Sequence, residues 1–138
     1  RAPNTLDTSC IILAGGEGRR VGGQDKGLVL YNGQPLIQAV INRVKDQVDD
    51  IVISANRNID SYRNYTRHVI RDTSSEYRGP LSGIAASLPY CKHSRVLIVA
   101  CDMPLLPDDL VSRLSNAIEL YDIAIATIDG HHQLAMLI

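Results

Sequence analysis

Short apolar runs alternate with longer amphipathic stretches along the chain, and this alternation constrains the fold more than any other feature of the sequence. The runs are nearly continuous in apolar residues, which is typical of strands that are buried on both faces of a parallel sheet. We therefore expect five strands, at residues 10–14, 50–55, 67–70, 95–100 and 122–128.

The stretches between these runs have helical periodicity. The first places Leu36, Val40 and Val44 four residues apart, so that they share one helix face. Each stretch begins with a proline, a residue favoured in the first turn of a helix. The last stretch continues with two acids, which suit the positive end of the helix dipole. The predicted helices span residues 35–48, 80–88 and 107–120.

Strands that alternate with helices predict an α/β fold, Rossmann-like and doubly wound, with a mainly parallel sheet. Asp129 and Gly130 separate two further β-like runs, which is a hairpin signal, so we expect an antiparallel strand near the C-terminus. The length of 138 residues predicts a single domain, 1–138. Because the chain begins without methionine and ends inside the apolar run LAMLI, we expect the C-terminus to be truncated.

Charge and composition argue against several classes of protein. A net charge of −1 gives no overall basic field for nucleic acid or anionic membranes, and no apolar run reaches the ~20 residues of a membrane span. Cys10, Cys91 and Cys101 are odd in number and lack CxxC spacing, which argues against a disulfide framework or a zinc site. Cys10 and Cys101 adjoin apolar runs, which favours buried thiols in a reduced, cytoplasmic compartment.

The segment LAGGEGRRVGGQDKG, residues 13–27, follows the first predicted strand. Ligands of open α/β sheets bind beyond the carboxyl ends of the strands, where this segment begins. Its glycines allow backbone N–H groups to approach an anion closely, and Arg19, Arg20 and Lys26 add positive charge. Phosphate is therefore the expected ligand, whereas a solvated glycine-rich surface loop is the alternative without function.

Two common phosphate-binding motifs do not fit this segment. The Walker pattern fails because Gly27 follows Lys26 where serine or threonine is needed. The dinucleotide fingerprint fails because Val21 stands in place of its third glycine, and because the second strand ends in SANR without the usual acid. These failures count against a nicotinamide-dependent oxidoreductase.

The sequence LAGGEGRRVGGQDKGL (13–28) resembles the signature of nucleotidyltransferases that move an NMP group from an NTP. The resemblance is closest to the molybdenum cofactor guanylyltransferases, whose further motifs follow in order over residues 9–138. These are NGQPLI (32–37), VISANR (52–57), IRDTSSEYRGPLSG (70–83) and ACDMPLLP (100–107).

The chain departs from that family in three respects. Val21 stands where methionine is usual, and Ser54 replaces an asparagine that contacts nucleotide in relatives. Family members also continue for roughly fifty residues, the length of two or three further elements. Because that part helps to form the pterin side of the site, the resemblance implies that this chain binds nucleotide more readily than it catalyses.

The resemblance also implies roles for individual residues. Catalytic roles fall on Lys26, Arg20 and Asp102, and Asp102 is the implied ligand of Mg²⁺. Contacts with the nucleotide fall on Leu13, Ala14, Gly15, Gly16, Lys26, Ser54, Asp72, Gly79 and Asp102. His131 and His132 correspond to a strand entry near the pterin substrate.

The residue types alone leave alternatives open at several of these positions. Asp102 could equally cap a turn before the helix predicted at residue 107, and Asp72 could form an Asx turn or an N-cap. Paired histidines in a turn are commonly just solvated, and no base is evident beside Cys101 to make it a nucleophile. The Pro104 ring argues against a helix directly after Asp102 and favours an extended segment there.

The function implied by the resemblance is transfer of GMP from GTP to molybdopterin, with release of pyrophosphate. Acceptor molybdoenzymes and the molybdenum-inserting protein are the implied protein partners. Four alternatives remain: a cytidylyltransferase acting on the same pterin, a sugar-1-phosphate nucleotidylyltransferase, an oxidoreductase, and a non-catalytic NTP-binding domain. The residues alone do not decide between guanine and cytosine.

Overall fold

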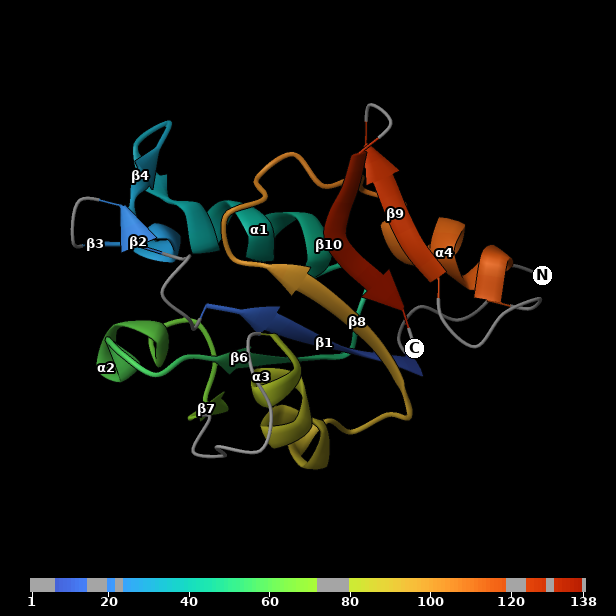
Figure 1. Ribbon diagram of the computed structural model, residues 1–138, viewed down its shortest axis with the longest axis horizontal. Helices are drawn as coiled ribbons and strands as arrows, with labels where there is room; N and C mark the ends of the chain where they lie inside the picture. The colour runs from blue at the N-terminus through green and yellow to red at the C-terminus, as the bar shows by residue number, and fades with distance from the viewer. Residues whose placement is uncertain are drawn as a thin grey trace.

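A six-stranded sheet forms the centre of the molecule (Figure 1). The structure, a computed structural model, describes residues 7–14, 20–21, 24–71, 80–118, 124–128 and 131–137. Four neighbouring strands are parallel, and two antiparallel strands complete the sheet. Their order across the sheet is β7 (Val69–Ile70), β6 (Asp50–Ser54), β1 (Thr8–Leu13), β8 (Arg95–Ala100), β10 (His131–Leu137) and β9 (Ala124–Ile128).

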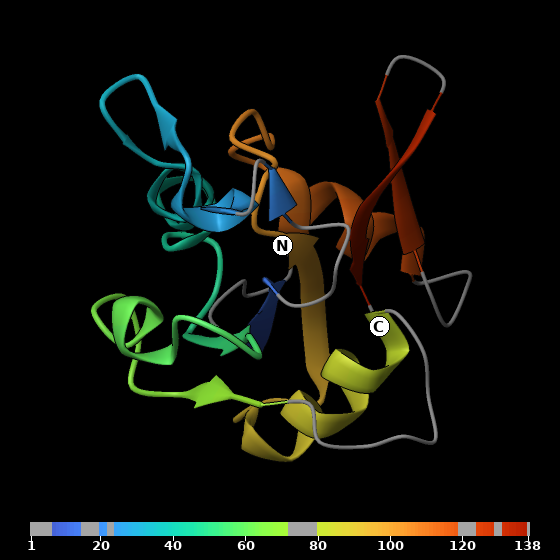
Figure 2. The same ribbon diagram turned by 60° about the vertical axis from the view of Figure 1, so that its left-hand side comes forward.

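Helices cover both faces of this sheet, as a doubly wound fold requires. Helices α1 (Leu36–Val44) and α4 (Leu110–Ile118) share a core with one face, and α3 (Pro80–Ser87) packs against the other (Figures 1 and 2). The predicted α/β architecture with a mainly parallel sheet is confirmed.

Strand β1 shows why the apolar runs are continuous. Its residues alternate between the two cores: Cys10 and Ile12 pack with α1 and α4, whereas Ile11 and Leu13 pack on the side of α3. All four side chains are at most 4% exposed, so neither face of the strand tolerates a polar side chain. Cys10 and Cys101 are buried, as expected, Cys91 is partly exposed, and none of the three forms a disulfide in the described part of the chain.

Two predicted helices start later than the prolines suggested. Helix α4 begins at Leu110, three residues after the predicted start at Pro107. The side chain of Gln47 explains the shift, because its Oε1 accepts the Val111 N–H at 2.8 Å and its Nε2 donates to the Pro107 carbonyl at 3.1 Å. Pro107 therefore lies in a turn that Gln47 ties to the helix. Helix α1 begins at Leu36, with Pro35 as its N-cap.

Small elements precede α1. Strands β2 (Arg20–Val21) and β3 (Gln24–Asp25) pair antiparallel, and the 3₁₀ helix η3 (Lys26–Leu28) follows. Strands β4 (Leu30–Tyr31) and β5 (Gln34–Pro35) form a hairpin that our sequence analysis missed. Its turn residues Asn32 and Gly33 have φ of 51° and 84°, so the Asn-Gly pair was the available signal.

The last two strands form the antiparallel pair that the sequence predicted. Strand β9 pairs with β10, which in turn pairs antiparallel with β8. The expected turn residues Asp129 and Gly130 lie outside the described residues. Among the helices of the described parts of the chain, none has the length and apolar character needed to cross a membrane.

The amino ends of three central strands are joined by a cluster of polar side chains. Asp50 accepts hydrogen bonds from Ser9 Oγ at 2.5 Å and from the Lys92 N–H at 3.1 Å. The His93 N–H donates to Ser9 Oγ at 3.0 Å, and the His93 ring lies 2.8 Å from Asp49 Oδ2. Asp49, Asp50 and His93 lie close enough to share a metal ion. The contacts named here already give each carboxylate a protein partner, so the cluster acts as a clamp between β1, β6 and β8.

Candidate nucleotide site

The carboxyl ends of the parallel strands lie at one edge of the sheet, on the left in Figure 1, and the described site residues Leu13, Ser54 and Asp102 lie at or just after these ends. Hydrogen bonds hold the end of β1 to both neighbours: Ala14 N–H donates to the Ser54 carbonyl at 2.8 Å, and Cys101 N–H donates to the Leu13 carbonyl at 3.0 Å. The chain runs from β1 to β6 on one side and later crosses to β8 on the other. Such a switch point is where open α/β sheets bind ligands.

Lys26 and Asp102 meet at this switch point from distant parts of the sequence. Lys26 opens η3, and Asp102 lies in the turn after β8. The Nζ atom of Lys26 is 3.7 Å from Oδ2 of Asp102, and the two side chains are 32% and 19% exposed. A cation and a carboxylate thus stand together, both accessible to a ligand. The residues after Asp102 form turns where the sequence predicted an extended segment, and no helix begins before Leu110.

The residue after Lys26 is packed too tightly to accept a larger side chain without a shift of its neighbours. A Cβ atom on Gly27 would stand 2.6 Å from Tyr62 Oη, closer than real Cβ contacts, and 3.3 Å from Cys101 Cβ, which is tighter than most of them. Tyr62 is fully buried and ends the one-turn helix α2 (Ile59–Tyr62). Burial, followed by the neighbouring Cys101 and Asp25, raises the pKa of the Tyr62 hydroxyl. This hydroxyl finds no hydrogen-bond partner in the described part of the chain.

The residue before Lys26 is also fixed by α2. Asp25 is only 7% exposed, and its Oδ2 accepts a hydrogen bond of 2.7 Å from Nδ2 of Asn58. Asn58 precedes α2 in the left-handed conformation, with φ of 54°. Sequence analysis missed both Asn58 and Tyr62, because neither belongs to a periodic pattern or a phosphate motif.

Helix α3 approaches the end of β6 closely. A Cβ atom on Gly83 would lie 2.5 Å from Ser54 Oγ, so glycine is needed where this helix passes the strand. The start of α3 at Pro80 is as the sequence predicted. Ser54 itself is 3% exposed.

Other predicted site residues are placed in part or not at all. Arg20 lies on β2, where its backbone pairs with Asp25. His131 and His132 begin β10, opposite Ile128 and Thr127. The predicted nucleotide contacts Gly15, Gly16, Asp72 and Gly79 lie outside the described residues.

The donor set at Asp102 suits a hard divalent cation. Mg²⁺ in nucleotide sites is commonly held by one or two carboxylates, and phosphate oxygens and water complete its ligands. The partly exposed Asp102 carboxylate at the end of a buried strand would provide such a ligand, and Lys26 beside it would provide positive charge for phosphate oxygens. The residues present therefore fit the metal that the resemblance implies.

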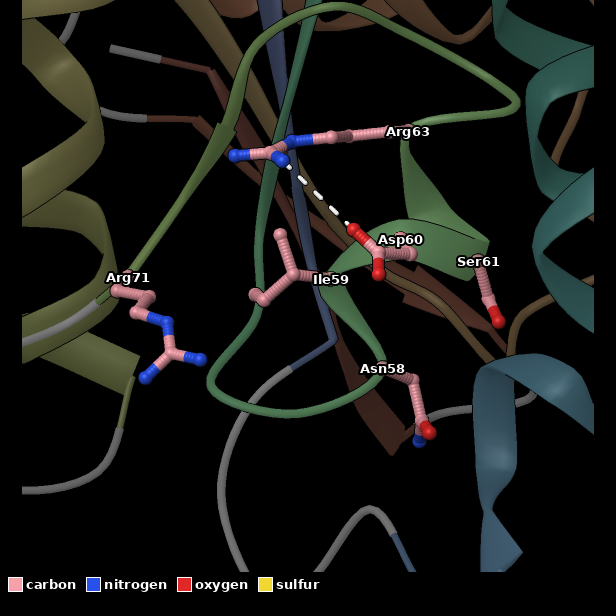
Figure 3. Close-up of a pocket in the computed structure, with 6 residues that line it drawn as sticks. All are labelled: Asn58, Ile59, Asp60, Ser61, Arg63 and Arg71. Atoms are coloured by element: carbon pink, nitrogen blue, oxygen red, sulfur yellow. Dashed lines mark ion pairs between the residues drawn. The ribbon is translucent and has the colours of Figure 1, made fainter.

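A polar pocket of about 480 Å³ lies next to this site and was not expected from the sequence. Figure 3 shows its lining, which comes from α2 and from the ends of the neighbouring segments: Asn58, Ile59, Asp60, Ser61, Arg63 and Arg71. Asp60 points to Arg63, and their charged atoms are 3.7 Å apart. The exposed Arg71 has no ion-pair partner among the residues that the structure describes.

Comparison with known proteins identifies the family. The model of the MobA-like NTP transferase domain matches residues 10–138. The chain belongs to this family. This match confirms the family that the glycine-rich segment indicated, and it covers residues 10–138 of the chain.

Curated relatives and solved structures agree with this assignment. The molybdenum cofactor guanylyltransferase of Shewanella putrefaciens is 49% identical over 124 residues, which cover 88% of this chain and 64% of that protein. The one from Vibrio cholerae is 46% identical over 127 residues, which cover 92% and 62%. Molybdopterin-guanine dinucleotide biosynthesis protein A from Archaeoglobus fulgidus shares the fold, with a TM-score of 0.65, 24% identity, and coverage of 93% and 66%. This MobA-like chain thus spans just under two thirds of the length of these relatives.

Proposed function

We propose that this chain binds GTP with Mg²⁺ and forms the nucleotide half of a molybdenum cofactor guanylyltransferase. The observation that carries the proposal is the meeting of Lys26 and Asp102 at the switch point of the sheet, 3.7 Å apart. The names of the relatives at 46–49% identity support guanylyl transfer as the reaction.

In this reaction a terminal phosphate oxygen of molybdopterin forms a bond to the α-phosphorus of GTP. The bond from that phosphorus to the oxygen bridging to the β-phosphate breaks, and pyrophosphate leaves with the electron pair. The attacking phosphate is already an anion, so the site needs no strong base. It needs alignment of two anions and neutralisation of the charge on the leaving group. Lys26 supplies positive charge for these oxygens, and we assign the same role to Arg20 and the loop amides.

Asp102 is the proposed ligand of Mg²⁺, which when bound would offset phosphate charge next to the reacting phosphorus. Leu13, Ala14 and Ser54, at the ends of two strands, are proposed to contact the nucleotide. The same role is proposed for Gly15, Gly16, Asp72 and Gly79.

We further propose that residues 1–138 form one nucleotidyltransferase domain. The absence of disulfides among the described cysteines supports the proposal of a reducing, cytoplasmic location.

Calorimetric titration of the chain with GTP and CTP, with and without Mg²⁺, tests the proposal. We expect Mg²⁺-dependent binding of GTP that is tighter than binding of CTP. Absence of GTP binding contradicts the proposal, and preference for CTP reassigns the chain to the cytidylyl branch. Pyrophosphate release with GTP and molybdopterin, measured on this chain and on one extended to the length of its relatives, then tests turnover. Binding without release by the longer chain supports a non-catalytic domain instead.

A further inference from the structure

The residues on both sides of Lys26 are fixed by the same short element, α2. Asp25 before the lysine bonds to Asn58 at the start of α2, and Gly27 after it packs on Tyr62 at the end of α2. A lysine side chain has many rotamers, and restricting the backbone on both sides of it limits where its ammonium group can reach. Helix α2 and the residue before it thus contact both neighbours of Lys26 and restrict the backbone at this lysine.

The Asp25–Asn58 contact has the properties of a strong and specific hydrogen bond. Asp25 is 7% exposed, and a buried carboxylate is costly unless donors satisfy it. Its distance of 2.7 Å to the Asn58 amide is typical of charge-assisted hydrogen bonds. The left-handed φ of 54° at Asn58 also limits the choice of residue, because glycine, asparagine and aspartate adopt it most readily. Of these three, only asparagine provides an N–H donor for a carboxylate.

The side chain of Asn58 is separate from the charges of the adjacent pocket. Figure 3 shows the Asn58 amide pointing away from Arg63 and Arg71, while Asp60 points to Arg63. Asn58 therefore bonds to the segment that contains Lys26, whereas Asp60 pairs with Arg63 on the exposed side of α2.

We infer that Asn58 and Asp25 are positioning residues for Lys26, and that they hold its ammonium group opposite Asp102. The inference rests on the proposed function, in which Lys26 binds the triphosphate. Neither residue has to touch the nucleotide, since each acts through the backbone of Lys26. Loss of the amide is expected to weaken GTP binding only as far as it releases this lysine.

Asn58→Gly provides the direct test, because glycine keeps the left-handed backbone and removes the amide without changing the charge. We expect GTP binding in Mg²⁺ to weaken about tenfold, a loss of the size expected for one charge-assisted hydrogen bond. In a Lys26→Ala background the same change should alter GTP affinity less than about twofold, because the group being positioned is gone. Full additivity of the two changes overturns the inference.

A swapped pair tests whether the contact itself matters. Asn58→Asp places two carboxylates side by side and should weaken GTP binding, whereas the double variant Asp25→Asn with Asn58→Asp restores an amide-to-carboxylate bond and should recover most of the affinity. Asn64→Asp, an exposed position just after α2, is the matched control for the added charge and should change affinity little. The inference is contradicted if the double variant does not recover affinity although circular dichroism shows that both it and Asn58→Asp are folded.

A readout without nucleotide separates this inference from the proposed function. The NMR signal of the Lys26 ammonium group, identified by its loss in Lys26→Ala, should move in Asn58→Gly and stay in place in Asn64→Asp. If the wild-type chain binds no GTP, the proposed function fails while this signal still decides the inference. An unmoved Lys26 signal in Asn58→Gly overturns the inference even where GTP binds normally.

Discussion

The Nζ atom of Lys26 lies 3.7 Å from Oδ2 of Asp102, although the two residues belong to segments at opposite sides of the switch point. The lysine is held by the elements between β1 and α1, and the aspartate follows β8. Because each group is partly exposed, the pair offers a cation for phosphate oxygens and a carboxylate for a divalent metal at one point. The first two predictions separate these two contributions.

Replacing Lys26 by alanine should weaken GTP binding at least about tenfold, because a charge-assisted contact with the triphosphate is lost. In the extended protein it should also lower the rate of pyrophosphate release. Calorimetric titration and a pyrophosphate assay measure these effects. Lys45→Ala is the control, since Lys45 is an exposed lysine after α1 and should behave as wild type. Equal affinities for Lys26→Ala and Lys45→Ala would remove Lys26 from the proposed site.

Replacing Asp102 by alanine should remove metal-dependent turnover in the extended protein and abolish the gain in GTP affinity that Mg²⁺ gives. Titrations of GTP with and without Mg²⁺ measure this gain in wild type and variant. Asp109→Ala is a suitable control, because its exposed carboxylate pairs with Arg113 on the surface of α4. If Asp102→Ala keeps the full effect of Mg²⁺, the metal is bound elsewhere.

The packing of Gly27 on Tyr62 gives a prediction for stability. Gly27→Ala should lower the free energy of unfolding by about 1–3 kcal/mol, since its Cβ would stand 2.6 Å from a fully buried hydroxyl. Tyr62→Phe removes that hydroxyl, which lacks a partner among the described residues, and should leave stability unchanged or raise it by about 1 kcal/mol. The double variant should regain most of the loss. Urea denaturation measures all three, and a double variant as unstable as Gly27→Ala contradicts this packing.

The fold and the edge that carries the site could be predicted because both depend on local, repeated patterns. Runs such as residues 95–100 are apolar at nearly every position since both faces of the strand are buried, and β8 has the predicted bounds. Parallel strands bring their carboxyl ends to one edge, so Asp102 was expected beside the segment that follows the first strand. Leu13 and Ser54 were assigned to the site through the family resemblance.

The supporting contacts could not be predicted, because single polar residues in loops carry no pattern. Gln47 looks like any surface glutamine in the sequence, yet it holds the start of α4 through Val111 and Pro107. Asn58 likewise reveals its role only when α2 lies beside Asp25. Such contacts depend on which loops the tertiary structure brings together, and local sequence patterns do not show this.

The clamp at the amino edge of the sheet gives a prediction for pH dependence. The hydrogen bond with His93, aided by the charge of Lys92, holds the pKa of Asp49 below its ordinary value of 3.8. A carboxylate with a lowered folded-state pKa stabilises the fold above the unfolded-state value, and this contribution is lost as pH falls through the folded-state value. Asp49→Asn should therefore be less stable than wild type at about pH 7, and the difference should shrink as the pH falls below the ordinary value of 3.8 and through the lowered folded-state pKa.

Urea denaturation of wild type and Asp49→Asn at several pH values measures this difference. Asp60→Asn is the matched control, because the Asp60 carboxylate is fully exposed and lies 3.7 Å from Arg63, so its loss should change stability little at any pH. A gap between wild type and Asp49→Asn that stays constant as the pH falls from about 7 to well below 3.8 would contradict the prediction. It would show that the aspartate at position 49 stabilises the clamp by shape alone and not through its ionised form.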